Sequence, residues 1–151
     1  MTKHYLYFHK VFCDGSTKLC YGRLFSGYGV YFGENSPYNI AGASSAKTST
    51  VAELMAIREA YRMIAYRNNN KNYEVVTDCI AAYTMVERRA PVSAFFDPLL
   101  NQIWRCEKAT RGKIRIAFVK AHGNDIGNKC AHNLATVGRK RHIAWYNNNR
   151  W

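Results

Sequence analysis

Short runs of hydrophobic residues, rich in aromatic and β-branched side chains and separated by turn residues, fill the first third of the chain. Runs of this kind predict β-strands. We expect three strands, over residues 5–13, 27–33 and 38–43, and we expect the first to stop at Asp14, which a Gly-Ser pair follows. Strands so closely spaced favour an antiparallel meander.

The hydrophobic period changes from Thr50 onward. Leu54, Ile57, Tyr61 and Ile64 follow one another at steps of three and four residues, which is the spacing of one helix face. This pattern predicts an amphipathic helix of about four turns. The asparagine-rich stretch 68–72 ends it.

Strand and helix patterns alternate through the rest of the chain. We expect a strand over 73–77, a helix through Met85, a helix from Asp97-Pro98 to Ala109, a strand over 114–119 and a last helix from near Asn128. Asp97 is expected to cap its helix, with proline at the first helical position. No linker is long enough to separate two domains. The order β-β-β-α-β-α-α-β-α indicates an α/β fold with one central mixed sheet flanked by helices.

The charge of the chain indicates a polyanionic partner. The 151 residues include 22 Lys and Arg against 10 Asp and Glu, a formal net charge of +12, and the pI is near 9.7. Such an excess is typical of proteins that bind nucleic acid, although a merely soluble basic surface has the same composition. The hydrophobic content of 48% is enough for a sizeable core and excludes intrinsic disorder.

Neither a membrane segment nor a disulfide framework is expected. No apolar run approaches the roughly 18–20 residues of a membrane span, and the first residues lack the apolar segment of a signal peptide. We therefore expect a soluble, cytoplasmic protein. No two of the five cysteines have Cys-x-x-Cys spacing. We expect reduced thiols that pack in the core, without a zinc site.

Three acids stand where catalytic or metal-binding groups are common. Asp14 and Asp78 each follow an apolar strand, and ligands of α/β sheets gather at such strand ends. Glu53 lies in the expected first turn of the long helix, directly before Leu54 of its buried face. If the two strands are neighbours, the three carboxylates converge. Oxygen ligands of this kind suit Mg²⁺ or Mn²⁺.

Each of these acids also has an ordinary structural role open to it. Asp14 before Gly15 is a common turn residue. Glu53 in a first turn complements the helix dipole. Asp78 is a suitable N-cap for the helix that follows it. Their joint placement favours the metal site.

Four short motifs occur in the order of a known family. They are Phe12-Cys13-Asp14-Gly15-Ser16, Thr48 with Ala52-Glu53-Leu54, Val76-Thr77-Asp78, and Val119-Lys120-Ala121-His122 followed by Gly127-Asn128 and Leu134-Ala135. With these motifs the chain resembles type 1 ribonuclease H. The resemblance implies the ribonuclease H-like fold, whose central mixed five-stranded sheet has three antiparallel strands and then two parallel ones.

The resemblance also implies an activity. The family hydrolyses the RNA strand of RNA/DNA hybrids with two Mg²⁺ ions bound to four acids, leaves 5′-phosphate products, and accepts Mn²⁺ as a possible substitute. By position, Asp14 would bridge both ions, and Glu53 with Asp78 would hold one of them. Two such cations activate the attacking water and stabilise the leaving 3′ oxygen.

His132 stands where the family has its fourth acid. A neutral imidazole can bind a metal, but it carries no negative charge and suits Mn²⁺ better than Mg²⁺. Holliday-junction resolvases of the RuvC group, from the same superfamily, are similar in using a histidine there. We therefore expect His132 to be a ligand; a weakened site, or Asp125 swinging in from the loop, are the alternatives. Lys129 replaces a family glutamate, and we interpret it as a solvated helix residue.

The resemblance assigns further residues to catalysis and substrate binding. His122 would belong to a mobile loop that transfers protons or helps the product to leave, unless it is a surface residue without a role. RNA would be distinguished from DNA at its 2′-hydroxyls. The residues in position to contact the substrate are Gly15, Ser16, Thr48, Ser49 and Thr50.

Two substrate positions leave alternatives open. Thr48 would hold a phosphate of the DNA strand, or it simply caps the helix. Cys79-Ile80 stands where the family has Ser-Gln, which removes two polar contacts. RNA recognition is therefore less securely encoded than catalysis.

We divide the chain into a catalytic domain, residues 1–138, and a basic aromatic C-terminal tail, residues 139–151. The basic protrusion that many bacterial members carry after the second helix is missing, whereas cations alternate with aromatic rings in the tail. The tail would contact nucleic acid in place of the protrusion, or it is a solvated segment whose Trp145 packs on the core.

Three functions fit these features. The first is a monomeric endoribonuclease acting on RNA/DNA hybrid. The second is a resolvase-like DNA nuclease on the same fold, which His132 suggests. The third is a nucleic-acid-binding module without activity. The first is favoured, because a decayed site in so acid-poor a chain would have little reason to keep three of the four acids.

Overall fold

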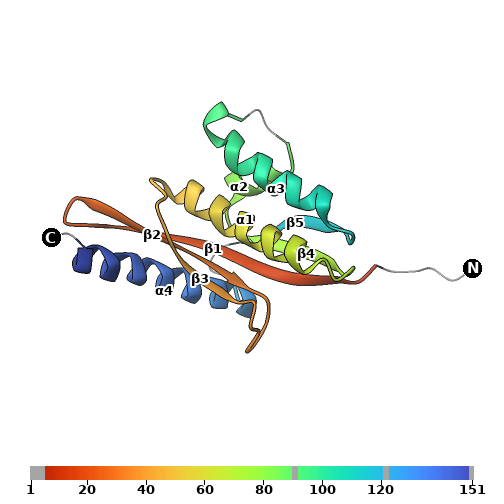
Figure 1. Ribbon diagram of the computed structural model, residues 1–151, viewed down its shortest axis with the longest axis horizontal. Coiled ribbons are helices and arrows are strands. Elements are labelled where there is room, and N and C mark those ends of the chain that lie inside the picture. Colours follow the sequence, from red (N-terminus) through yellow and green to blue (C-terminus); the bar gives the residue numbers. More distant parts are fainter. Residues whose placement is uncertain (1–5, 90–91, 121–122, 150–151) are drawn as a thin grey trace, which may run out of the picture.

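The computed structural model describes residues 6–89, 92–120 and 123–149. Figure 1 shows the arrangement of its elements. In chain order they are β1 (Phe8–Cys20), β2 (Arg23–Tyr31), β3 (Ile40–Ser44), α1 (Ser49–Arg67), β4 (Asn72–Thr77), α2 (Ile80–Val86), the 3-10 turn η1 (Ala94–Phe96), α3 (Asp97–Ala109), β5 (Ile114–Phe118) and α4 (Ile126–Asn149).

One five-stranded sheet forms the centre, in the order β3-β2-β1-β4-β5. β1 pairs antiparallel with β2, and β2 with β3, whereas β1 with β4 and β4 with β5 are parallel. The predicted sheet of three antiparallel strands followed by two parallel ones is therefore confirmed.

The prediction that the first strand stops at Asp14 is wrong. β1 pairs with β4 only as far as Cys13, opposite Thr77, but its hydrogen bonds with β2 continue to Cys20. Tyr21 and Gly22, both at positive φ, form the turn of this long hairpin, as in the type I′ geometry that suits right-handed strand twist. β2 accordingly begins earlier than expected, at Arg23.

Helix α1 covers one face of the sheet and carries α3 on its outer side. The predicted apolar face is confirmed, because Leu54, Ile57, Tyr61 and Ile64 are all fully buried. Burial of each such side chain contributes about 1.5–3 kcal/mol. The core therefore lies between β1, β2, β4 and this pair of helices.

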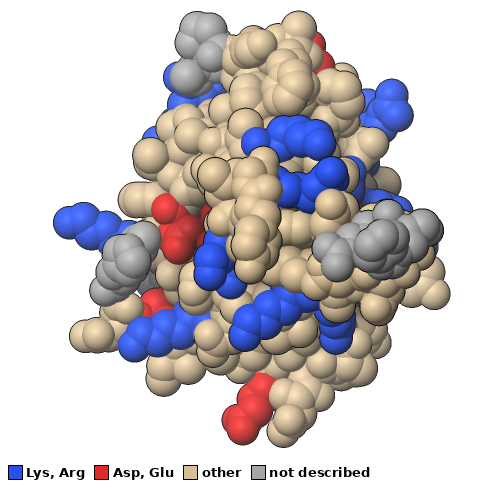
Figure 2. Space-filling view, turned by 90° about the vertical axis from the view of Figure 1, so that its left-hand side faces the viewer, with Lys and Arg blue, Asp and Glu red and all other residues tan. Residues whose placement is uncertain are grey.

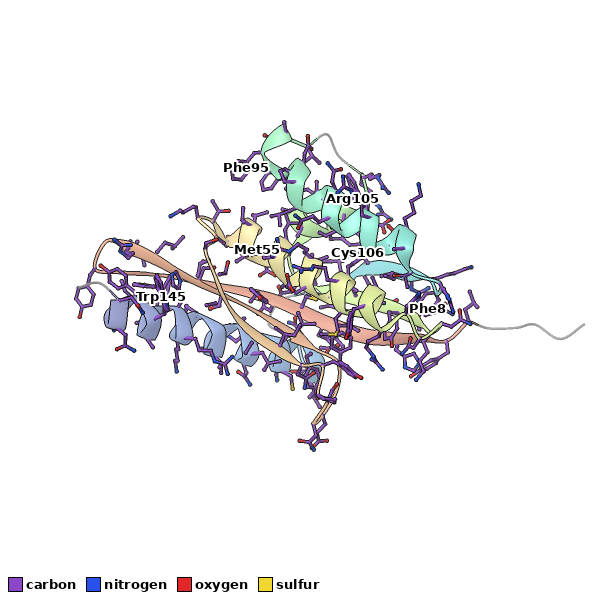
Figure 3. All side chains as sticks on the ribbon, viewed as in Figure 1. Phe8, Met55, Phe95, Arg105, Cys106 and Trp145 are labelled. Atoms are coloured by element: carbon purple, nitrogen blue, oxygen red, sulfur yellow. The ribbon has the colours of Figure 1, made fainter. Side chains whose placement is uncertain are left out.

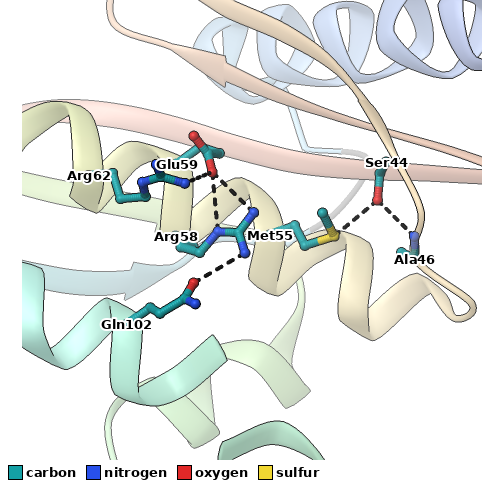
Figure 4. Close-up of polar contacts among 7 residues, drawn as sticks. All are labelled: Ser44, Ala46, Met55, Arg58, Glu59, Arg62 and Gln102. Atoms are coloured by element: carbon teal, nitrogen blue, oxygen red, sulfur yellow. Dashed lines mark hydrogen bonds and ion pairs between the residues drawn. The ribbon is translucent and has the colours of Figure 1, made fainter. Parts of the chain in front are cut away.

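Polar contacts fix α1 against its neighbours (Figure 4). Arg58 Nη1 donates to Gln102 Oε1 of α3 at 3.2 Å. At the other end, Ser44 Oγ donates to Met55 Sδ and accepts from the backbone N–H of Ala46, both at 3.0 Å. The loop that joins β3 to α1 is thus held close to the helix.

Helix α4 covers the opposite face of β1, β2 and β3, where glycines let it approach closely. A Cβ at Gly29 would lie 2.8 Å from Leu134 Cβ. A Cβ at Gly27 would overlap the backbone of Arg139, and one at Gly138 would overlap the backbone of Gly42. The helix therefore lies with its backbone almost against the strands.

Helix boundaries differ from the predicted ones at two places. α4 begins at Ile126, where Asp125 Oδ1 accepts from the backbone N–H of Asn128 at 3.1 Å. It then runs unbroken to Asn149, so residues 139–149 of the expected tail are helical; a functional boundary at residue 138 stays a prediction. Asp97 is the first residue of α3 and not its cap, because η1 precedes it.

The cysteines and the hydropathy add little to this fold. All five thiols are free, and Cys13 is fully buried in the core, whereas the other four are half-buried. Across the described ranges no helix is both long and apolar enough to span a membrane.

Gly138→Ala is expected to destabilise the protein, although alanine is the better helix former by about 1 kcal/mol. The added methyl group would overlap the backbone of Gly42, and such overpacking costs about 1–3 kcal/mol. Urea denaturation measures the change in the free energy of unfolding. Ala144→Gly, at an exposed position of the same helix, is the control and should lose only about 1 kcal/mol. A Gly138→Ala variant as stable as the parent would contradict the close packing of α4.

Candidate active site

Asp14 and Asp78 come together because β1 and β4 are parallel neighbours. The last residue pair of these two strands is Cys13 with Thr77, so each aspartate lies one residue beyond it. Asp14 is buried within β1, and its Oδ1 accepts from the backbone N–H of Gly15 at 3.0 Å. The interpretation of Asp14 as a turn residue is therefore wrong.

Glu53 reaches the same place from α1. A Cβ at Gly15 would lie 2.7 Å from the backbone of Ala52 and Glu53, so only glycine lets the helix approach β1 here. The prediction that Glu53 lies in the first turn is wrong, because α1 begins at Ser49 and its first turn holds no acid. The helix dipole acts mainly within that turn and does not explain Glu53.

The three carboxylates converge as predicted. Asp14, Glu53 and Asp78 each offer one oxygen atom, and these atoms all lie within 4.8 Å of one another. Asp78 is not the N-cap of α2, since that role belongs to Cys79, whose Sγ accepts from the backbone N–H of Ala82. The ordinary structural roles thus fail to account for any of the three acids.

Burial and repulsion raise the pKa values of two of these acids, Glu53 and Asp78. Burial, reinforced by the charges of Asp14 and Asp78, raises the pKa of Glu53 to about 11. Burial and the charge of Asp14 also raise the pKa of Asp78. Cys13 precedes Asp14 and is fully buried, and burial raises the pKa of its thiol well above the usual value. The site thus concentrates carboxylates that are poorly compensated.

The donor set fits a divalent cation. Glu53 Oε2 is buried without a hydrogen-bond partner. In residues 6–89, 92–120 and 123–149, no Lys or Arg forms an ion pair with any of the three acids. A cation would supply the missing positive charge, and a set of carboxylate oxygens suits Mg²⁺ or Mn²⁺.

His132 also lies at the site, but it touches the acids at one point. Its Nδ1 is 2.9 Å from Asp14 Oδ2, and its side chain is 63% exposed. It is not among the groups whose ligand atoms all lie within 4.8 Å. Its role as a metal ligand stays a prediction.

Asn128 belongs to the fourth motif, but the sequence pattern assigned it no role at the site. Its Nδ2 donates to Asp78 Oδ2 at 3.3 Å, and its side chain is buried with Oδ1 unpartnered. Asn128 and His132 are four residues apart and therefore share one face of α4. The four-residue spacing from His132 was the signal in the sequence that could have identified Asn128 as a site residue. Gly127 lets the turn approach, because a Cβ there would overlap the ring of Phe12.

The remaining predicted residues have mixed outcomes. Asp125 caps α4 and is outside the carboxylate cluster, and Lys129 is exposed, as interpreted. His122 lies outside the described residues. Thr48 caps α1 by accepting from the backbone N–H of Val51 at 3.2 Å.

The other predicted substrate contacts surround the start of α1. Thr48 and Ser49 are exposed, Thr50 is half-buried and Ser16 is buried in β1. Their contacts with RNA or DNA stay predictions. Figure 2 shows the wider surface on one face, where Lys and Arg side chains are spread broadly and Asp and Glu occupy few places.

Comparison with known sequences agrees with this geometry. The sequence profile of the RNase H family, described as RNase H, matches residues 8–140. The chain belongs to the RNase H family. It is 30% identical over 161 aligned positions to the Ribonuclease H of Saccharomyces cerevisiae, covering 87% of this chain and 45% of that protein. It thus spans about half the length of this relative.

Solved structures of the RNase H fold are similar although their sequences differ. LC11-RNase H1, isolated from compost, has a TM-score of 0.71 at 13% identity over 89% of this chain and 96% of that one. The N-terminal RNase H domain of a Mycobacterium tuberculosis protein has a TM-score of 0.67 at 19% identity, over 90% of this chain and 97% of that one. The protease-reverse transcriptase of prototype foamy virus has a TM-score of 0.68 at 19% identity, over 92% of this chain and 22% of that one. At such identities these likenesses confirm the fold alone.

Glu53→Gln is expected to stabilise the metal-free protein and to abolish its stabilisation by metal. The pKa of the Glu53 carboxyl is raised in the folded protein. The folded state is therefore favoured at pH values below the ordinary pKa of glutamate and loses stability as pH rises above that value. A neutral amide removes this loss, which should raise Tm at pH 7 by about 3 °C or more. Thermal melts in chelator and in Mn²⁺ measure both effects.

Glu59→Gln is the matched control, because Glu59 pairs with Arg58 and Arg62 on α1 instead of joining the cluster. It should leave the rise of Tm with Mn²⁺ unchanged. An equal rise of Tm with Mn²⁺ in Glu53→Gln would show that Glu53 does not bind the ion.

Proposed function

We propose that this RNase H-family chain is an endoribonuclease that hydrolyses the RNA strand of RNA/DNA hybrids with two divalent cations. The observation that carries the proposal is the cluster of Asp14, Glu53 and Asp78 within 4.8 Å, with a buried and unpartnered oxygen on Glu53. Two relatives support it: the yeast protein is named Ribonuclease H, and LC11-RNase H1 has been solved in complex with RNA/DNA hybrid.

Neighbouring groups orient the side chains that would bind the ions. Asp14, Glu53, Asp78 and His132 would bind the ions, Mg²⁺ with Mn²⁺ as a substitute. Bound cations supply the positive charge that activates water and stabilises the leaving 3′ oxygen. Asp14 is oriented from two sides, by the Gly15 N–H and by His132. Asp78 is oriented by Asn128, and groups of this kind are needed for full metal affinity.

The substrate would lie across the start of α1. The Gly15-Ser16 main chain and the hydroxyls of Thr48, Ser49 and Thr50 would contact the nucleic acid, the 2′-hydroxyls of RNA among its groups. His122, which precedes α4 in the sequence, would transfer protons or assist product release. The products carry 5′-phosphates, and the protein acts as a cytoplasmic monomer.

A second candidate is a resolvase-like DNA nuclease on the same fold. His132 in place of a fourth acid favours it, as does the apolar Cys79-Ile80 pair after Asp78. A non-catalytic binding module is the third candidate. The choice of substrate distinguishes the first two, and binding without cleavage identifies the third.

Cleavage should require Asp78 and should be selective for hybrid. Labelled RNA/DNA hybrid, double-stranded RNA and double-stranded DNA are incubated with Mg²⁺ or Mn²⁺, and products are resolved on denaturing gels. Asp78→Asn should lower the rate at least about 100-fold, because it removes a charge that holds the cations. Asp97→Asn, at the start of α3, is the control. Full activity of Asp78→Asn would exclude the metal mechanism, and faster cleavage of DNA would select the resolvase-like enzyme.

Substitutions of His132 test its own role. His132→Ala should slow hybrid cleavage about 10- to 100-fold, the range for loss of a group that orients or supplements metal ligands. His132→Asp should raise the Mg²⁺ rate relative to the Mn²⁺ rate, since a carboxylate suits Mg²⁺ better than imidazole does. Lys129→Ala, exposed on the same helix, is the control. Wild-type rates for His132→Ala would remove His132 from the site.

A further inference from the structure

The C-terminal half of α4 is anchored on the long β1–β2 hairpin. His142 Nδ1 accepts from the backbone N–H of Ser26 at 3.1 Å. The ring of Phe25 lies 5.1 Å from that of His142 and 5.5 Å from that of Tyr146, and Arg23 stacks on Tyr146 at 4.4 Å. These contacts hold one side of the helix and thereby fix which residues face outward.

Trp145 is on an outward side of this anchored segment. It is 62% exposed and borders a shallow hollow of about 420 Å³. Figure 3 labels Trp145 on α4 and Met55 on α1, the two helices that contribute to the hollow. The other lining residues are Ala43, Ser44, Ser45 and His142. We call this hollow the Trp145 surface.

The surroundings of the Trp145 surface are cationic. Five of its six lining residues come from two segments, 35–52 and 126–149, neither of which contains an Asp or Glu. Lys47, Lys140 and Arg141 are exposed on these segments. Arg141 is four residues before Trp145, so the two share a helix face, and its Nη1 donates to Ala41 O of β3. An exposed indole with Arg141 on the same helix face is suited to a polyanion with flat, stackable groups.

The Trp145 surface lies within reach of the carboxylate cluster. Trp145 is thirteen positions after His132 in α4, which at 1.5 Å per residue is a rise of about 20 Å along the helix axis, with the two side chains on different sides of the helix. The loop that follows Ser44 leads directly to Thr48 at the start of α1. A strand spaced at about 3.4 Å per nucleotide would cover the 20 Å in about six nucleotides.

We infer that the Trp145 surface binds a single-stranded extension of the nucleic-acid substrate. An unpaired base stacks on Trp145, and Arg141 lies near its phosphates. A base inside a duplex has both faces covered by its neighbours, so an exposed indole favours the single strand. The inference rests on the proposed function only in taking RNA/DNA hybrid as the adjoining duplex.

The test compares hybrids with and without an extension. Dissociation constants are measured by fluorescence anisotropy in the Asp78→Asn background, for a blunt hybrid and for hybrids with ten-nucleotide extensions of RNA or DNA at either end, a length chosen to exceed the ~6 nucleotides of the span. We expect at least one extension to tighten binding about tenfold, the scale of one stacked base. Trp145→Ala should abolish this difference and Trp145→Phe should keep most of it.

Two controls show whether the effect is specific to Trp145. Tyr66→Ala, at an exposed aromatic residue of α1, should keep the preference for the extension. Thermal melts confirm that each variant is folded. The inference is wrong if no extension tightens binding, if Trp145→Ala keeps the preference, or if sedimentation shows a dimer that Trp145→Ala dissociates.

The outcome is independent of the cleavage assay. Blunt hybrid that is cleaved while extensions bind no tighter would overturn the Trp145 surface and leave the proposed function standing. If extensions bind through Trp145 but the parent protein cleaves no hybrid, the Trp145 surface stands and the proposed function is overturned.

Discussion

Three carboxylates are held within 4.8 Å of one another beside a hydrophobic core. Like charges so close in a poorly solvated place repel strongly. The elements that carry Asp14, Glu53 and Asp78 cannot separate to relieve this repulsion, because hydrogen bonds between β1 and β4 and the buried face of α1 fix them. Protonation or a bound cation would relieve it, so the fold itself prepares a place suited to a cation.

The two faces of the sheet serve this constraint differently. The face toward α1 is filled by large side chains and provides the core. The face toward α4 has glycines in β2 and β3, so that this helix approaches the strands almost backbone to backbone. The close approach is what brings Asn128 and His132 within hydrogen-bond distance of Asp78 and Asp14.

The sequence pattern correctly predicted the features that are set by residues close to one another in the chain. The predictions of the buried face of α1 and of the order of elements were correct, because both follow from the hydrophobic periodicity. The length of β1 was not, because its second half depends on pairing with β2 and not on its own residues. Glu53 was correctly placed in the cluster although its turn was wrong, and Asn128 was missed because its contact with Asp78 joins segments 50 residues apart.

The contact between His132 and Asp14 has a kinetic consequence. It joins residues 118 positions apart, and contacts of such long range close large loops, whose entropy cost slows folding. The acids lie on β1, at the end of β4 and on α1, all of which are synthesised before α4. During synthesis the three acids would therefore leave the ribosome before the helix whose Asn128 and His132 orient two of them.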